Sequence, residues 1–435
     1  MQRRRVLGLL AASVAAVTVP LPAQATTGPG PVLTNWYRLV LELVRHTATY
    51  SPPVASRAFA YLGVTAYQAM AAGNPALHSL AGQLNALTPL PAPEAGAVYD
   101  QTAVLNAALA DAVEYFFGNT GPTGQRAMKA MARQMDALVA DLPDDVLIRS
   151  QDHGRAVAAH IIAWSLDDGG AVIENMGFPY EYALTEGPSH WVPTGPIRQQ
   201  QLPLLPNWGK NRTFAMTSGT ACGLPAPIDY SEDPASAFYG EAQEVVTVKA
   251  GLTDEQKTIA RFWSDDPMLS PTPPGHWISI ALQIIARDGL DAVRSADVLM
   301  RLGVTVADGF IGCWASKMEH DLLRPVTYIR RLMDPKWEPL LITPPFPEYP
   351  SGHSTQSGAA ATVLTAIFGE SFAFSDATHI DDGIAARDFP SFWAAAEEAA
   401  ISRLYGGIHF RAAISRGLDQ GRCIGAATVA IRTLT

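Results

Sequence analysis

Apolar residues recur at helical spacing along most of this chain, and this periodicity limits the possible fold more than any other feature. Residues three and four apart share one face of a helix, so an apolar stripe with this spacing predicts a helix packed on a core. Such stripes cover 33–49, 54–72, 94–117, 124–142, 154–166, 236–250, 253–261, 274–286, 295–323, 354–368, 391–405 and 411–433. We therefore predict an all-α fold.

The helical pattern is interrupted once over a long stretch. From about residue 170 to 234, proline, glycine and aromatic residues are dense and no apolar period survives. Connections of this length without helices or strands are uncommon unless they are ordered and functional. We predict two helical bundles, at 26–168 and 236–435, joined by an irregular ordered connection at 169–235, with the functional site in the C-terminal bundle.

Composition excludes several classes of protein. The 435 residues are 48% hydrophobic and carry a net charge of −10, which is ample for a large core and argues against nucleic-acid binding. Three widely spaced cysteines, Cys222, Cys313 and Cys423, match no zinc pattern and allow at most one disulfide. We expect Cys313 to be a buried thiol.

The N-terminus has the features of an export signal. Arginines at 3–5 precede an apolar stretch, which is followed by the small-x-small sequence Ala23-Gln24-Ala25. Two arginines before x-Val-Leu match a twin-arginine signal, with an ordinary export signal as the alternative. We expect residues 1–25 to be a signal peptide and the protein to reach the periplasm or the medium. We expect no other stretch to span a bilayer and therefore do not expect an integral membrane protein.

Cationic residues in the C-terminal part match the needs of an oxyanion site. Lys317 lies in the proline-free segment 295–323 and Arg324 follows directly after it. Their separation of seven residues is almost two helical turns, so one helix can direct both cations to the same anion. A third cation, Arg403, stands six residues before His409. Arginine adds a planar fork of donors that suits phosphate-like oxygens.

The segment Ser351-Gly352-His353 precedes the predicted helix 354–368. Ser351 is a suitable N-cap, and backbone amides at a helix N-terminus favour an anion. A histidine at this place can exchange protons near neutral pH. The Gly406-Gly407 bend can turn His409 inward, where its ring can attack phosphorus or bind a metal. Each segment alone is more often a turn or a solvated helix face, but their joint occurrence favours an oxyanion site.

The order of these motifs resembles the vanadium-dependent haloperoxidases of the type 2 phosphatidic acid phosphatase superfamily, and their bacterial members in particular. The stretches 262–266 and 271–277 also resemble the approach to the site in that family. The resemblance implies vanadate as cofactor and hydrogen peroxide as co-substrate. It implies that vanadate oxygens are held by Lys317, Arg324, Arg403, Ser351 and Gly352. It further implies that His409 bonds vanadium, that His353 moves the protons of the peroxide, and that Asp266 orients Arg403.

Two aromatic residues match the halide pocket of the family. Chloride-oxidising members carry Trp and Phe at the places of Trp314 and Phe346, whereas bromide-preferring members tend to have histidine in place of the phenylalanine. A dry apolar pocket strengthens the oxidant and excludes water. The resemblance therefore favours chloride or bromide as substrate without settling the halide. Ordinary core packing is the alternative for either aromatic residue.

The sequence departs from the family pattern after the expected vanadium ligand. The family usually has an aspartate four residues beyond this histidine, where the chain has Ala413. We expect Asp419 or a backbone carbonyl to orient His409 instead. Acidic residues near the site, Glu348 among them, would weaken an oxyanion unless their charge is screened.

We predict a vanadate-dependent haloperoxidase that oxidises halide with hydrogen peroxide to hypohalous acid or an equivalent and halogenates a small organic substrate. The first alternative is a secreted acid phosphatase in which His409 is the nucleophile and His353 protonates the leaving group. Histidine-bound vanadate resembles the transition state of that reaction, so the same donors serve both. The second alternative is a protein that binds vanadate or phosphate without turnover. A homo-oligomer is compatible with the sequence.

Overall fold

The computed structural model describes residues 28–173, 178–179 and 181–434, so the predicted signal peptide lies outside the described residues. The first helices are α1 (Pro29–Arg45), α2 (Pro52–Ala71), α3 (Gln101–Phe116), α4 (Pro122–Asp136) and α5 (Asp144–Ser165). The later helices are α7 (Ala237–Ala250), α8 (Asp254–Phe262), α9 (Thr272–Asp288), α10 (Ala292–His320), α11 (Pro325–Leu332), α12 (Gly352–Phe368), α13 (Phe392–Tyr405) and α14 (Arg411–Val429). The predicted all-α class is confirmed.

Helix capping explains why the predicted and observed bounds of α8 and α12 agree closely. The predicted starts of α3 and α5, at 94 and 154, were wrong, and α11 was not predicted. The Ser351 side chain accepts a hydrogen bond from the Ser354 amide and caps α12, as predicted. Thr253 and Gln256 form the predicted capping box of α8. The sequence pattern missed a two-stranded antiparallel hairpin, β1 (Phe374–Asp376) and β2 (Arg387–Phe389), whose strands are too short to show a period.

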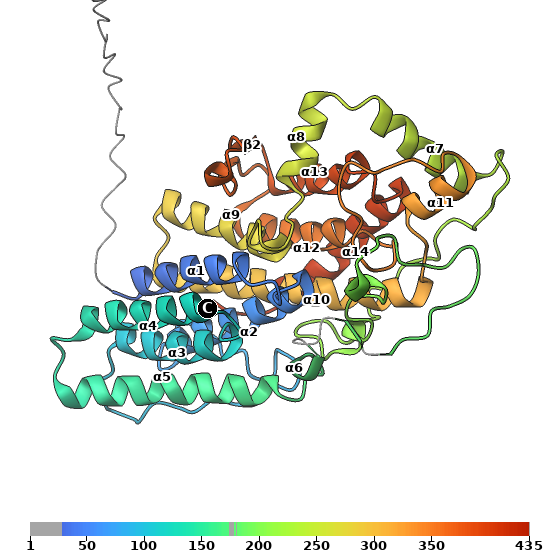
Figure 1. Cartoon of the computed structure of the whole chain (residues 1–435). Coiled ribbons are helices and arrows are strands. Elements are labelled where there is room, and N and C mark those ends of the chain that lie inside the picture. The colour runs from blue at the N-terminus through green and yellow to red at the C-terminus, as the bar shows by residue number, and fades with distance from the viewer. Residues whose placement is uncertain (1–27, 174–177, 180, 435) are drawn as a thin grey trace, which may run out of the picture.

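Helix α10 lies at the centre of the fold (Figure 1), with α2 on one side and α12 and α14 on the other. A Cβ atom on Gly303 would lie 2.6 Å from the Phe59 carbonyl oxygen, and one on Gly63 would lie 2.8 Å from Met300 Cα. Glycine at these two positions therefore lets the backbones of α2 and α10 approach closely. One continuous hydrophobic core runs from α1 through α10 to the residues after α14. The division into two bundles stays a prediction.

Helix α10 is long and apolar enough to cross a membrane, contrary to our expectation that no described stretch would meet this test. Of its most apolar 18-residue window, 89% is buried inside the fold. Burial of this extent is typical of the core helix of a globular protein.

The predicted single helix carrying both Lys317 and Arg324 is wrong. Helix α10 ends at His320, because Asp321 adopts the left-handed conformation with φ 44°. Arg324 is the N-cap of α11, and Pro325 occupies the first helical position, where proline is favoured. The two cations therefore reach the site from different elements.

Over its described residues the irregular connection contains only short elements, α6 (Gly170–Ile173), η2 (Arg198–Gln200) and η3 (Trp208–Lys210). It is tied to the helices of the site at several points. The buried Asp308 of α10 accepts hydrogen bonds from the amides of 214–216, at 2.7 to 2.8 Å. A disulfide joins Cys222 to Cys423 of α14, and Cys313 is a buried free thiol, as expected.

Candidate active site

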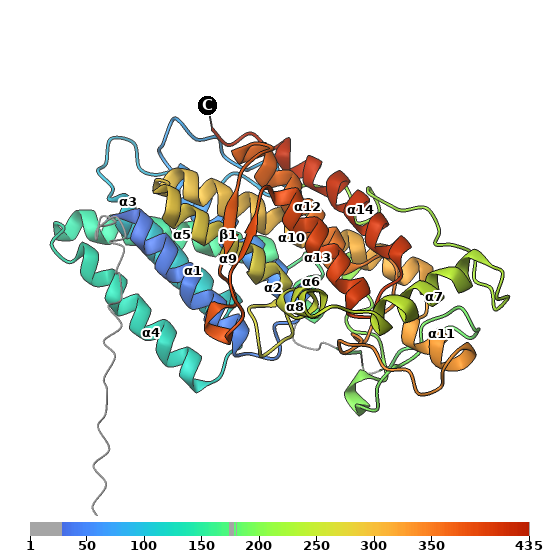
Figure 2. The ribbon, with the colours of Figure 1, turned by 90° about the horizontal axis from the view of Figure 1, so that it is seen from above.

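A cavity of about 460 Å³ opens where the ends of α10, α12 and α13 meet the connection and the loop before α9. Viewed from above (Figure 2), α12, α13 and α14 lie beside one another next to α10. Seven predicted site residues line this cavity: Asp266, Trp314, Phe346, Gly352, His353, Arg403 and His409. A larger cavity of about 710 Å³ lies elsewhere and is lined by other residues, such as Asp297 and Arg301.

The ammonium group of Lys317 lies behind the loop that leads into α12. It donates hydrogen bonds to the carbonyls of Pro347, Glu348 and Pro350, the first two at 2.9 Å. Burial, with a smaller contribution from the charge of Arg324, lowers the pKa of Lys317 to about 7. Lys317 therefore fixes the shape of the loop and adds positive charge beneath the cavity.

Arg324 connects the same loop to the predicted vanadium ligand. Its Nε donates to the Phe346 carbonyl at 2.8 Å, and its Nη1 lies 2.9 Å from the Ile408 carbonyl and 3.1 Å from His409 Nε2. Its Nη2 is buried and has no hydrogen-bond partner among the described residues. This free donor is available to an oxygen of a bound anion.

Arg403 approaches the cavity from α13. Its Nη1 donates to the Trp263 carbonyl at 2.8 Å, whereas its buried Nε has no partner within the described part of the chain. Burial lowers the pKa of Arg403 to about 10, and Asp266 and Asp265 oppose this effect. Asp266 is thus an electrostatic neighbour of Arg403, although the hydrogen bond of Nη1 goes to Trp263. The orienting role of Asp266 stays a prediction.

His409 has a carboxylate partner that the sequence pattern did not identify. Its Nδ1 lies 2.8 Å from Oε1 of Glu348, which also accepts the Phe410 amide at 2.9 Å. With Nδ1 as donor, Nε2 keeps its lone pair and accepts from Arg324. Burial and the nearby cations hold the pKa of His409 well below its usual range, so the ring is neutral. A neutral, oriented imidazole suits a metal ligand or a nucleophile.

The expectation that Asp419 orients His409 is therefore wrong. Asp419 is exposed on α14 and lies 3.4 Å from Arg416. The backbone-carbonyl alternative is also wrong for Nδ1, which faces the Glu348 carboxyl group. Burial raises the pKa of Glu348 to about 7, because Arg324 and Lys317 offset only part of the desolvation cost.

The start of α12 places Gly352 and His353 at the wall of the cavity, whereas Ser351 is buried next to them and is not among the described residues that line it. The His353 Nε2 atom is buried, lies 3.9 Å from Asp265 Oδ2 and has no hydrogen-bond partner among the described residues. Burial and the charge of Arg403 hold the pKa of His353 well below its usual range, whereas Asp265 and a hydrogen bond to the Trp263 backbone raise it.

The two predicted halide-pocket residues contact each other, with ring centroids 4.9 Å apart. The Phe346 ring also lies 5.2 Å from Lys317 Nζ and 5.0 Å from Arg324 Cζ, so its face meets both cations. Trp314 Nε1 donates to the Leu204 carbonyl of the connection at 3.1 Å. Together these rings form an apolar wall beside the cationic part of the cavity.

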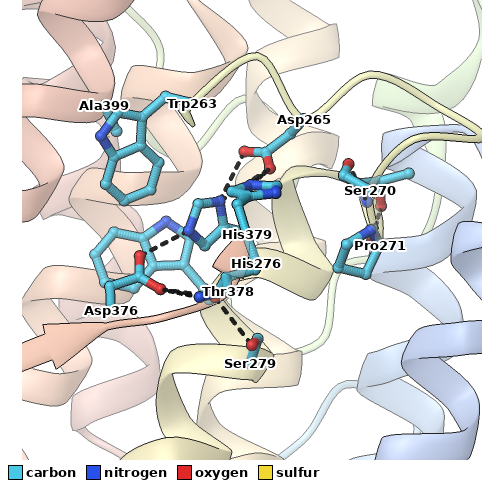
Figure 3. Close-up of polar contacts among 12 residues, drawn as sticks. Trp263, Asp265, Ser270, Pro271, His276, Ser279, Asp376, Thr378, His379 and Ala399 are labelled. Carbon is cyan, nitrogen blue, oxygen red and sulfur yellow. Dashed lines mark hydrogen bonds and ion pairs between the residues drawn. The ribbon is translucent and has the colours of Figure 1, made fainter. Parts of the chain in front are cut away.

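Sequence reasoning placed Trp263, Asp265 and His276 in stretches that resemble the approach to the site, but it gave these residues no role and did not identify His379. Trp263 accepts a hydrogen bond from Arg403 through its carbonyl and stacks on His276 at 4.4 Å. Asp265 lines the cavity and contacts His276 and His379 (Figure 3). The adjacent acids at 265 and 266 were a visible signal, but His276 lies in the next helix, α9, and His379 lies in the distant segment between β1 and β2.

The donors present fit a tetrahedral oxyanion such as vanadate. Three buried cations stand near one another, and each has a lowered pKa because burial disfavours its charge. Arg324 Nη2 and Arg403 Nε are buried and have no partner among the described residues, a costly arrangement unless a bound group accepts from them. A bound anion would satisfy these donors and neutralise the excess positive charge.

Comparisons with known proteins agree with this geometry. The family model of the VCPO second helical-bundle domain matches residues 297–433. The vanadium chloroperoxidase of Curvularia inaequalis is 26% identical over 410 residues, or 78% of this chain, and the match spans 66% of that protein, slightly less than two thirds. The structure of the first bacterial vanadium-dependent iodoperoxidase aligns with a TM-score of 0.84 and 37% identity, covering 95% of this chain and 98% of the other. A holo-type bacterial vanadium-dependent chloroperoxidase shares the fold, with a TM-score of 0.64 and 17% identity over 94% of this chain and 93% of the other.

Proposed function

The chain belongs to the vanadium-dependent haloperoxidase family, and we propose that it binds vanadate and oxidises halide ions with hydrogen peroxide to hypohalous acid or an equivalent. The observation that carries this proposal is the state of His409. Its Nε2 lone pair faces the cavity region beside Arg324, because Nδ1 is bound to Glu348. A ring held in this tautomer is ready to bond a metal centre.

We propose that vanadate oxygens are held by the unpartnered donors of Arg324 and Arg403, by the Gly352 amide and by the Ser351 hydroxyl. Lys317 acts through its charge from behind the loop, since its hydrogen bonds go to three carbonyls. Bound vanadate supplies a Lewis acid that activates hydrogen peroxide without a change of oxidation state. The residues of the chain orient the anion and offset its charge.

His353 is the proposed acid–base group for the protons of the peroxide. It lines the cavity at the start of α12, and burial keeps its ring largely neutral before an anion binds. Trp314 and Phe346 exclude water from one wall and are the proposed halide contacts. We propose further that the product halogenates a small organic molecule and that the protein is exported rather than embedded in a membrane.

One feature of the structure supports the acid phosphatase alternative. A nucleophilic histidine depends on an oriented tautomer, and Glu348 supplies the orienting carboxyl group that the chain lacks at Ala413. The aromatic wall of Trp314 and Phe346 still favours halide oxidation. The two activities therefore have to be measured on the same samples.

We expect phosphate-free protein to halogenate a phenol dye only after vanadate is added. Vanadate is required because it completes the site. The assay uses hydrogen peroxide with iodide, bromide or chloride, because the sequence does not settle which halide is oxidised. Hydrolysis of a phosphate ester is measured in parallel, with and without vanadate as inhibitor. Failure with every halide, together with vanadate-inhibited hydrolysis, would move the protein to the phosphatases. Inactivity in both assays with retained vanadate binding would support the binding alternative.

A further inference from the structure

Asp265 belongs to a chain of carboxylates and imidazoles that includes His276, Asp376 and His379 (Figure 3). His276 is central to it, with Nδ1 2.9 Å from Asp265 Oδ1 and Nε2 2.7 Å from Asp376 Oδ2. His379 extends the chain, with Nε2 3.2 Å from Asp265 Oδ1 and Nδ1 2.9 Å from Asp382 Oδ2. Asp382 in turn forms an ion pair with Arg45 of α1. Asp265 is therefore held by two histidines, each with a carboxylate on its other nitrogen.

The charges in this network balance. Burial alone would lower the pKa of His276, but Asp265 and Asp376 together raise it to about 10. The pKa of His379 is also raised, despite its burial, by hydrogen bonding to Asp265. With both rings protonated, His276, His379 and Arg45 neutralise Asp265, Asp376 and Asp382. A network whose charges and ring nitrogens are all paired is complete without an added ion.

The backbone at Asp265 is unusual in a way that favours a functional role. Its φ of 49° lies in the left-handed region, which few residues other than glycine adopt. Such a conformation is strained and persists where surrounding contacts maintain it. Here the two histidines hold the carboxylate, and the conformation places that carboxylate at the wall of the cavity.

The inner end of the network faces the site residues directly. Asp265 Oδ2 lies 3.9 Å from His353 Nε2, an atom otherwise without a hydrogen-bond partner among the described residues. Trp263 adds a second link, because its ring stacks on His276 while its carbonyl accepts from Arg403. At His353, the negative charge of Asp265 opposes the positive charge of Arg403.

We infer that Asp265 is a positioning residue for His353, held in place by His276 and His379 and acting through its charge on the Nε2 side of the ring. The inference rests on the proposed function, since it concerns the histidine that handles the protons of the peroxide. In this role Asp265 keeps His353 oriented and stabilises the protonated imidazole of His353 during turnover. Asp265 touches neither the halide nor the anion-binding donors through a hydrogen bond that the structure describes.

The central test is a double-mutant cycle of Asp265→Asn and His353→Ala, measured as halide oxidation with saturating vanadate. We expect Asp265→Asn alone to lower kcat about 10- to 100-fold with little change in the halide KM. In the His353→Ala background the same substitution should cost less than about 2-fold, because its target is gone. The matched control Asp388→Asn, at an exposed position of β2, should leave turnover unchanged. An equal loss in both backgrounds would overturn the inference.

Vanadate binding separates this role from a general structural one. Asp265 is a negative charge near Arg403, so Asp265→Asn should leave the vanadate Kd unchanged or slightly tighter in calorimetric titration. Weaker binding by more than about 10-fold would show that the substitution damages the anion site and would overturn the inference. This measurement needs no turnover.

Two further readouts complete the test. In protein with ¹⁵N-labelled histidines, Asp265→Asn should shift the ring signals of His353, assigned with His353→Ala, but not those of the exposed His78. This measurement tests the inference even if the wild type shows no turnover. Absence of turnover would contradict the proposed function but not the inference. Unchanged His353 signals would overturn the inference. Stoichiometric metal in the purified wild type that is absent from the His276→Gln variant would also overturn the inference, because Asp265, His276 and His379 would then be metal ligands.

Discussion

Substitution of His409 by alanine is expected to abolish vanadate binding and to lower halide oxidation at least about 1000-fold. The Nε2 atom of this ring keeps its lone pair, because Glu348 binds the opposite nitrogen, and it accepts a hydrogen bond from Arg324 that a bond to vanadium would replace. Alanine removes the proposed bond to vanadium and leaves the cations without a fixed centre. Vanadate titration by calorimetry and the dye halogenation assay measure the two effects.

Controls for His409→Ala have to exclude unfolding, since the ring is buried. The melting temperature is compared with that of the wild type, and His409→Asn serves as a second variant that keeps a polar side chain. His78→Ala, at an exposed position, is the matched control for loss of a histidine. Retention of vanadate-dependent turnover in a folded His409→Ala protein would refute the assignment of the ligand.

Substitution of Glu348 by alanine is expected to weaken vanadate binding about 10- to 100-fold, the usual cost of removing the partner of a metal-binding histidine. Two effects compete at this residue. Its charge repels an anion, but its Oε1 holds the Nδ1 proton of His409 and fixes the tautomer. Burial raises the pKa of Glu348 to about 7, which reduces its charge and hence the repulsion, so we expect orientation to dominate.

A graded series tests this balance at Glu348. Glu348→Gln keeps an acceptor for His409 and the Phe410 amide, so its loss of vanadate affinity should be smaller than that of Glu348→Ala. Glu319→Gln, at an exposed position of α10, should leave the vanadate Kd unchanged. Tighter binding in both Glu348 variants would show that charge repulsion prevails and that Glu348 is not the positioning partner of His409.

Local features of the sequence were sufficient to predict most of the fold. Helices such as α8 and α12 begin at side chains that cap them, Thr253 and Ser351, and caps are read from neighbouring residues. The glycine and serine at the start of α12 likewise predicted an anion site near a helix N-terminus. Apolar periodicity predicted most of the remaining helices, but it missed the short helix α11.

Features that depend on the path of the backbone could not be predicted in this way. Lys317 and Arg324 were assigned to one helix by their spacing, but a single left-handed residue, Asp321, ends α10 and redirects the chain. The left-handed conformation of a non-glycine residue has no strong sequence signal. Arg324 nevertheless reaches the cavity region, through hydrogen bonds to Phe346 and Ile408.

Partners that are distant in sequence were also missed. Glu348 replaces the aspartate expected near Ala413, yet it precedes His409 by 61 residues. The network around Asp265 joins it to His276 and His379, which are 11 and 114 residues away. Such pairs depend on how helices and loops pack, and a single sequence does not show which acid meets which histidine.

The most direct test of the central claim is a crystal structure of the mature protein grown or soaked with vanadate in phosphate-free buffer. Our account predicts vanadium bonded to Nε2 of His409, with vanadate oxygens facing Arg324 Nη2, Arg403 and the Gly352 amide, and with Glu348 still on Nδ1. Vanadate bound elsewhere, or absent from this cavity at a concentration that supports turnover, would contradict it.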